Sequence, residues 1–140
     1  MTSRVTMSGS FVLPCHPATA LPLFTPEGER RWVDGWVPVY HSAATDEVGA
    51  VWTTAAGAPT TWVTVVRDDD RVAYARVSAD GTAGLVQVRC LADGSGETTV
   101  EVTYDLTATD PRGRARLEDF ARDYADLLED WRARTRRMLA

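Results

Sequence analysis

The stretch that decides the fold is DPRGRARLEDFARDYADLLEDWRARTRRM, residues 110–138. Asp110 followed by Pro111 is typical of a helix N-cap with proline at the first helical position. No further proline interrupts the stretch, and its apolar side chains recur at the spacing of one helical face: Leu117, Phe120, Ala121, Tyr124, Leu128, Trp131 and Met138. A helix of this length extends about 40 Å, so its apolar face needs a broad partner.

Between the N-terminus and this helix, the chain consists of short apolar segments joined by tight turns. We predict strands at 4–13, 36–41, 50–54, 60–68, 71–78, 83–91 and 98–108. After the first strand, His16-Pro17 begins a short helix that reaches Phe24, and Thr25-Pro26 begins a second that ends near 34–35. Links this short force antiparallel pairing. The sequence therefore predicts one α+β domain, residues 1–140, with a curved antiparallel sheet of six to seven strands wrapped around the long C-terminal helix and two short helices after the first strand.

The last predicted hairpin has a register that can be deduced. If residues 93–97 form its loop, apolar side chains face each other in three pairs: Cys90 and Val100, Val88 and Val102, Val86 and Tyr104. On the other face Arg89 then lies opposite Glu101, which is a favourable charge pair. A shift by one residue would lose both agreements. The apolar face of this hairpin is the predicted partner of the terminal helix.

The hairpin with an Asp-Asp tip leaves two alternatives open. A two-residue loop pairs Asp68 with Arg71 and turns Tyr74 and Arg76 toward solvent. A three-residue loop turns Tyr74 and Arg76 inward, with Arg76 near Trp62, but it sets two arginines opposite each other. The charges favour the first alternative.

Composition excludes several classes of function. The chain has 15 basic side chains, all of them arginine, and a net charge of −5. Without lysine no lysine Schiff base can form, and the acidic balance argues against nucleic-acid binding. No apolar run reaches the roughly 20 residues of a membrane span, and we find no signal peptide, so we expect a cytoplasmic protein. Cys15 and Cys90 have no metal-ligand spacing and are expected to be free structural thiols.

Aromatic and charged side chains supply the candidate binding residues. Trp52 and Trp62 have matching parity across their hairpin and can share one face. Tyr104 and Tyr124 are expected to approach each other from sheet and helix, where buried hydroxyls need partners. An inward arginine would need a carboxylate, from the protein or from a ligand. No nucleophile motif, metal cluster or matched acid–base pair occurs, so catalytic residues stay unknown and neither a metal nor an organic cofactor is expected.

Four segments carry a resemblance to a known group of proteins: 24–36 (FTPEGERRWVDGW), 61–62 (TW), 74–76 (YAR) and 102–108 (VTYDLTA). They are similar to bacterial members of the START-like (SRPBCC) superfamily, in the polyketide cyclase and Hsp90-activator-like branch, which have the helix-grip fold. The resemblance implies an apolar cavity between sheet and terminal helix. Its expected lining is Trp36, Trp52, Trp62, Arg76, Val88, Val102, Tyr104, Phe120, Tyr124 and Leu128.

The resemblance implies that this cavity binds a small hydrophobic molecule, which is the interpretation we favour. One alternative is a polyketide cyclase- or aromatase-like enzyme in which Tyr104, Tyr124 and Arg76 orient carbonyls and enolates. Another is an Hsp90-activator-like interaction module that works through its surface. Catalysis ranks behind binding because the sequence offers no matched acid–base pair. Whether the chain forms a homodimer stays open.

Overall fold

The computed structural model describes residues 3–139. Its strands are β1 (Arg4–Leu13), β2 (Val39–Tyr40), β3 (Val51–Thr54), β4 (Thr60–Arg67), β5 (Arg71–Ser78), β6 (Thr82–Ala92) and β7 (Thr98–Ala108). Its helices are α1 (Pro17–Ala20), the 3-10 helix η1 (Leu21–Phe24), α2 (Pro26–Glu29) and α3 (Pro111–Arg137). The strands form one antiparallel sheet in the order β1-β7-β6-β5-β4-β3-β2.

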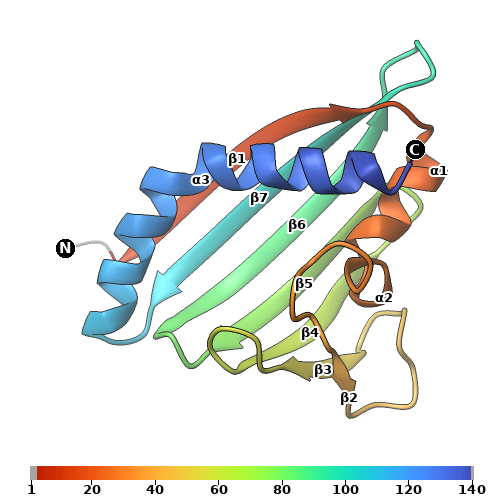
Figure 1. Cartoon of the computed structure of the whole chain (residues 1–140). Helices are drawn as coiled ribbons and strands as arrows, with labels where there is room; N and C mark the ends of the chain where they lie inside the picture. The colour runs from red at the N-terminus through yellow and green to blue at the C-terminus, as the bar shows by residue number, and fades with distance from the viewer. Residues whose placement is uncertain (1–2, 140) are drawn as a thin grey trace.

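The helices lie on one side of this sheet, which curves around the long α3 (Figure 1). Helix α3 packs against β1, β7 and β6, whereas α1 and η1 pack against β6 and β5. The first strand, β1, pairs along its whole length with the last strand, β7. The predicted architecture, a curved antiparallel sheet with a long terminal helix and short helices after the first strand, is confirmed.

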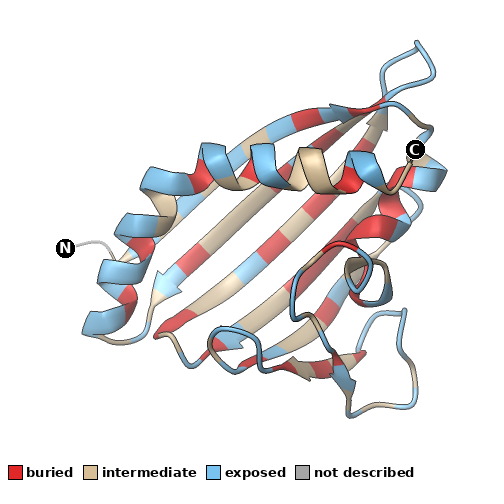
Figure 2. Ribbon diagram, in the orientation of Figure 1, coloured by how far each residue is buried: buried red, intermediate tan, exposed pale blue. Residues whose placement is uncertain are grey.

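The core lies between α3 and the concave face of the sheet. Buried and more exposed residues alternate along the strands, as expected when one face is covered (Figure 2). Leu117, Tyr124 and Leu128 of α3 are buried, and Val88 and Val102 of the sheet are buried opposite them. Complete burial of such a side chain contributes about 1.5–3 kcal/mol. The apolar stripe in the sequence therefore marks the face that packs.

Helix α3 begins where the sequence predicted. The Asp110 carboxylate accepts a hydrogen bond from the Gly113 amide at 3.0 Å, and Pro111 occupies the first helical position. Gly113 is buried against the β5–β6 turn: a Cβ atom there would lie 1.8 Å from the Gly81 carbonyl oxygen. This close approach of two backbones fixes the start of α3 over one end of the sheet.

The predicted register of the β6–β7 hairpin is confirmed throughout. Cys90 pairs with Val100, Val88 with Val102 and Val86 with Tyr104, while Arg89 faces Glu101 on the other side. The prediction succeeded because two independent patterns, apolar pairing and charge pairing, agreed on one register.

In the β4–β5 hairpin, each alternative is correct on one side of a β-bulge. At the tip, Asp68 donates its amide to the Arg71 carbonyl at 2.8 Å, as in the two-residue loop. Between Thr64 and Val66 the register shifts, and beyond it Trp62 pairs with Arg76, as in the three-residue loop. The expectation that Arg76 faces solvent is therefore wrong: the extra residue satisfies the charges at the tip and still turns Arg76 inward.

Two elements are shorter than predicted. The second short helix ends at Glu29. After this residue, backbone amides bond to the carbonyl three positions earlier, as the Trp32 amide does to the Glu29 carbonyl, and this tighter pattern no longer continues the α-helix. The strand predicted at 36–41 is reduced to β2, since Pro38 has no amide to donate. Trp36 therefore lies in an irregular segment.

Within residues 3–139, no helix combines the length and the apolar composition needed to cross a membrane.

Candidate functional site

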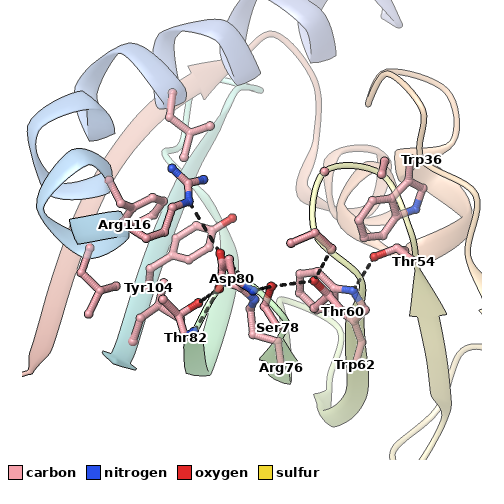
Figure 3. A pocket seen from close by; sticks show the side chains of 17 residues that line it. Trp36, Thr54, Thr60, Trp62, Arg76, Ser78, Asp80, Thr82, Tyr104 and Arg116 are labelled. Atoms are coloured by element: carbon pink, nitrogen blue, oxygen red, sulfur yellow. Dashed lines mark hydrogen bonds and ion pairs between the residues drawn. The ribbon is translucent and has the colours of Figure 1, made fainter. Parts of the chain in front are cut away.

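A pocket of about 290 Å³ opens between the sheet and the first half of α3 (Figure 3). Strands β4 to β7 supply its floor, the loop at 56–58 forms one rim, and α3 forms the opposite wall. The lining residues are Trp36, Thr54, Ala56, Gly57, Ala58, Thr60, Trp62, Arg76, Ser78, Asp80, Thr82, Tyr104, Leu106, Arg116, Leu117, Phe120 and Leu127. The pocket thus combines aromatic and aliphatic walls with one polar side, which is the usual composition of a small-molecule site.

One wall consists of two indole rings in contact with each other. Trp36 meets Trp62 edge to face, with ring centroids 5.6 Å apart. The Trp62 indole donates to Thr54 Oγ1 at 3.0 Å, and the Trp36 indole donates to the Pro26 carbonyl at 2.8 Å. Both polar nitrogens are therefore satisfied within the protein, which leaves ring faces and edges to contact a ligand.

The opposite wall pairs the sheet with α3. Tyr104 of β7 lies 4.9 Å from Phe120 of α3, measured between ring centroids. Burial raises the pKa of the Tyr104 phenol above its usual value, so the hydroxyl stays neutral at physiological pH. Figure 3 draws no hydrogen bond from this hydroxyl to the other pocket residues. No hydrogen bond of this hydroxyl occurs among the residues that the structure describes, so it can donate to a group inside the pocket.

Arg76 brings a positive charge to the pocket floor. Its side chain is only 12% exposed, and its guanidinium carbon lies 5.5 Å from the centre of the Trp62 ring. Its Nε is buried and has no hydrogen-bond partner in the part of the chain described. Burial lowers the pKa of Arg76, an effect that the neighbouring Tyr104 and Asp80 partly offset. The guanidinium remains charged at neutral pH because the ordinary pKa of arginine is so high.

Asp80 lies between Arg76 and a second arginine, Arg116 of α3. Its Oδ2 is 3.8 Å from Arg76 Nη2 and 3.6 Å from Arg116 Nε, while its Oδ1 accepts from the Thr82 hydroxyl at 2.6 Å. Burial alone would raise the pKa of Asp80, but the hydrogen bonds from Thr82 and the charge of Arg76 outweigh it. The pKa of Asp80 therefore lies below its ordinary value, and the group is an anion.

The structure brings together five of the ten residues proposed from the sequence. Those that line the pocket are Trp36, Trp62, Arg76, Tyr104 and Phe120. Trp52, Val88 and Val102 are core residues that do not reach it, and Trp52 stacks directly behind Trp62 with ring centroids 6.1 Å apart.

The remaining two proposed residues, Tyr124 and Leu128, face a separate hollow of about 430 Å³ between β1 and α3. The expected approach of Tyr124 to Tyr104 is confirmed, with centroids 6.0 Å apart. The Tyr124 hydroxyl donates to the Val102 carbonyl at 2.6 Å, so it has a partner inside the protein.

Sequence reasoning missed the polar side of the pocket, above all Asp80 and Arg116. Both positions carried a usable pattern. Asp80 continues the alternation Arg76, Ser78, Asp80 at the end of β5, and Arg116 precedes Phe120 by four residues on the same helical face. An aspartate followed by a glycine is typical of a turn, so the sequence around Asp80 does not by itself indicate a pocket residue.

Glu29, at the end of α2, is a second carboxyl group of interest. Among the residues described it forms no hydrogen bond or ion pair, and burial raises its pKa well above the ordinary range. Its negative charge also contributes to the raised pKa values of Tyr74 and Tyr104, which marks it as a neighbour of the interior aromatic residues.

Replacing Glu29 by glutamine is expected to change how stability depends on pH. A carboxyl group whose pKa is raised on folding stabilises the native state at pH values below its unfolded pKa, and this contribution is lost as the pH rises through the folded pKa. The free energy of unfolding of the wild type should therefore fall relative to Glu29→Gln from about pH 4 upward. Urea denaturation across pH 4–9 measures this, with Glu97→Gln in the exposed β6–β7 loop as control. Parallel curves for wild type and Glu29→Gln would contradict it.

No group of three or more histidine, cysteine or carboxylate side chains is arranged to hold a metal ion in residues 3–139. Cys15 and Cys90 are both free thiols, and burial raises the pKa of Cys90 to about 12. A thiol with so high a pKa is a poor nucleophile, which agrees with the structural role expected for Cys90.

Comparison with known proteins identifies the fold. No protein-family model and no curated protein matches the sequence. Norcoclaurine synthase from Thalictrum flavum, a point mutant in complex with a transition-state analogue, superposes with a TM-score of 0.71 at 8% identity, covering 99% of this chain and 95% of that one. A protein from Thermobifida fusca gives 0.62 at 21% identity, covering 84% and 83%. An HSP90 activator from Plasmodium falciparum gives 0.58 at 12% identity, covering 75% and 74%.

At these identities the likeness shows the fold alone. The chain has the helix-grip fold of START-like proteins, as the resemblance in its sequence implied. The similar structures include both an enzyme and an activator of another protein, so the fold by itself does not select a function.

Proposed function

We propose that this protein binds a small, largely apolar molecule in the pocket between the sheet and α3, with a polar end of that molecule held by Arg76. The observation that carries the proposal is the state of Arg76: an inward, largely buried guanidinium whose nearest carboxylate oxygen is 3.8 Å away. A charge-assisted hydrogen bond is normally 2.7–2.9 Å long. Arg76 therefore keeps donors that a ligand oxygen can use.

The walls of the pocket suit the rest of such a molecule. Trp36, Trp62 and Phe120 present ring surfaces, and Leu117 and Leu127 add aliphatic contacts. Apolar surface removed from water contributes about 25 cal/mol per Å², so contacts of this kind supply affinity while the arginine sets orientation. Norcoclaurine synthase, which has the same fold, holds a transition-state analogue, and this supports the assignment of a small-molecule site to the fold.

Native mass spectrometry of the protein purified from its own organism tests the proposal. We expect an added mass that is released on unfolding. Ala58→Trp, at the rim, should fill the pocket and abolish the added mass, whereas Ala115→Trp, on the exposed side of α3, should retain it. Repeated purification of all three proteins without any added mass would contradict the proposal.

A catalytic role is the second candidate, because one observation favours it. The Tyr104 hydroxyl and the Arg76 guanidinium border the same pocket, and both can donate hydrogen bonds to a carbonyl oxygen that becomes an enolate. The pocket lacks a matching base: Asp80, the carboxylate among its lining residues, has a lowered pKa and is shared by two arginines. For this reason binding without turnover is the function we infer first.

A further inference from the structure

The charges around the pocket are unequal. Arg76 and Arg116 contribute two positive charges and Asp80 one negative charge, so the charged lining residues sum to 2 − 1 = +1. Outside the lining, Asp110 and Arg112 near the start of α3 pair with each other at 2.9 Å and cancel. The pocket is therefore one negative charge short of neutrality at its polar side.

Asp80 is positioned to control this balance. Its distances to both arginines, 3.8 Å to Arg76 and 3.6 Å to Arg116, exceed those of a tight ion pair. The carboxylate is held instead by Thr82, whose amide and hydroxyl both donate to Oδ1, at 3.0 Å and 2.6 Å. It thus stays at its position as a fixed charge, and the arginines keep donors that point into the pocket.

We propose that Asp80 is a specificity residue that restricts the pocket to ligands with one negative charge, such as an aromatic or aliphatic carboxylate. This inference rests on the proposed binding function and adds the chemical class of the ligand. A monoanion that binds the pocket-facing donors of Arg76 and Arg116 brings the site to neutrality. A dianion, such as a phosphate monoester, places an excess negative charge beside Asp80, and like charges in close contact oppose binding.

Three naphthalene compounds that differ only in charge test this inference by isothermal titration calorimetry at pH 8. They are 2-naphthamide, which is neutral, 2-naphthoate, which is a monoanion, and 2-naphthyl phosphate, which is a dianion above its second pKa of about 6. We expect the wild type to bind the naphthoate about tenfold more tightly than either other compound. In Asp80→Asn the affinity for the phosphate relative to the naphthoate should rise about tenfold.

Two further variants control the experiment. Asp123→Asn makes the same change in net charge at an exposed position of α3 and should leave the ratio unchanged. Arg116→Gln removes one positive charge from a side chain that is 55% exposed, so the fold should tolerate it. This variant should lower naphthoate affinity about tenfold and leave the naphthamide affinity as it was.

The outcomes separate the two proposals. Naphthoate binding with the same phosphate-to-naphthoate ratio in wild type and Asp80→Asn would overturn the specificity role and leave the binding function standing. If Asp80→Asn does not fold, Arg116→Gln supplies the test. An unchanged affinity for naphthoate in that variant would show that Arg116 does not take part in the charge balance, and this would also overturn the specificity role of Asp80. No binding of any of the three compounds to the wild type would count against the binding function itself, and the role of Asp80 would fall with it.

Discussion

Arg76→Gln is expected to lower the affinity for a naphthalene carboxylate by about 100-fold, a loss of about 2–3 kcal/mol. The reason is that Arg76 is the least exposed charged group of the pocket, with 12% of its side chain accessible against 55% for Arg116. Screening by water is weakest there, so its interaction with an anion is stronger than at the rim.

The same substitution should not lower stability. In the ligand-free protein the Arg76 Nε is buried without a hydrogen bond from the described residues, and burial lowers its pKa. Removing such a charge from the interior relieves a desolvation cost. Calorimetric titration combined with urea denaturation measures both effects, and Arg122→Gln, an exposed position on α3, is the matched control. An affinity within threefold of wild type would show that Arg76 does not contact the ligand.

Gly113→Ala is expected to destabilise the protein by about 2–3 kcal/mol. Inside a helix alanine is normally favoured over glycine by about 1 kcal/mol, so propensity alone predicts the opposite sign. Here the new Cβ would meet a backbone carbonyl, that of Gly81, at 1.8 Å. To make room, the helix or the β5–β6 turn would have to move, and this would break the contact between Gly113 and Gly81 that positions Asp80 and Arg116.

A second glycine supplies the comparison for this prediction. A Cβ at Gly9 would lie 2.5 Å from Leu128 Cδ1, the flexible end of a side chain. Leu128 can change rotamer, so Gly9→Ala should cost less than Gly113→Ala, about 1 kcal/mol. Chemical denaturation of both variants decides the matter: equal losses, or a gain for Gly113→Ala, would refute the argument from backbone contact.

Much of this fold could be predicted from the sequence because independent patterns agreed. The α3 stripe, the Asp110 cap and the paired faces of β6 and β7 each required the same arrangement. The β-bulge in β4 could not be predicted, because an inserted residue leaves no mark in an alternating pattern until its partner strand is known. As a result the sequence left the direction of Arg76 open between two alternatives, and only the structure decides for the inward one.

The candidate site was predictable in part for the same reason. Trp62, Tyr104 and Phe120 follow from strand parity and helical spacing. Trp36 lies in an irregular segment, and its position depends on the hydrogen bond of its indole to the Pro26 carbonyl, which no periodic pattern encodes. Asp80 belongs to a turn whose place near α3 is set by the contact of Gly81 with Gly113. Contacts between segments far apart in sequence therefore account for what was missed.

The bulge in β4 has a consequence for how this protein can change over evolution. It separates the hairpin tip, where Asp68 meets Arg71, from the part of the hairpin where Trp62 pairs with Arg76. Mutations that alter the tip can accumulate without changing which side chains reach the pocket. Conversely, substitutions at positions 62 and 76 can alter the pocket lining without a new turn. The extra residue thus allows the turn and the pocket lining to vary independently within one hairpin.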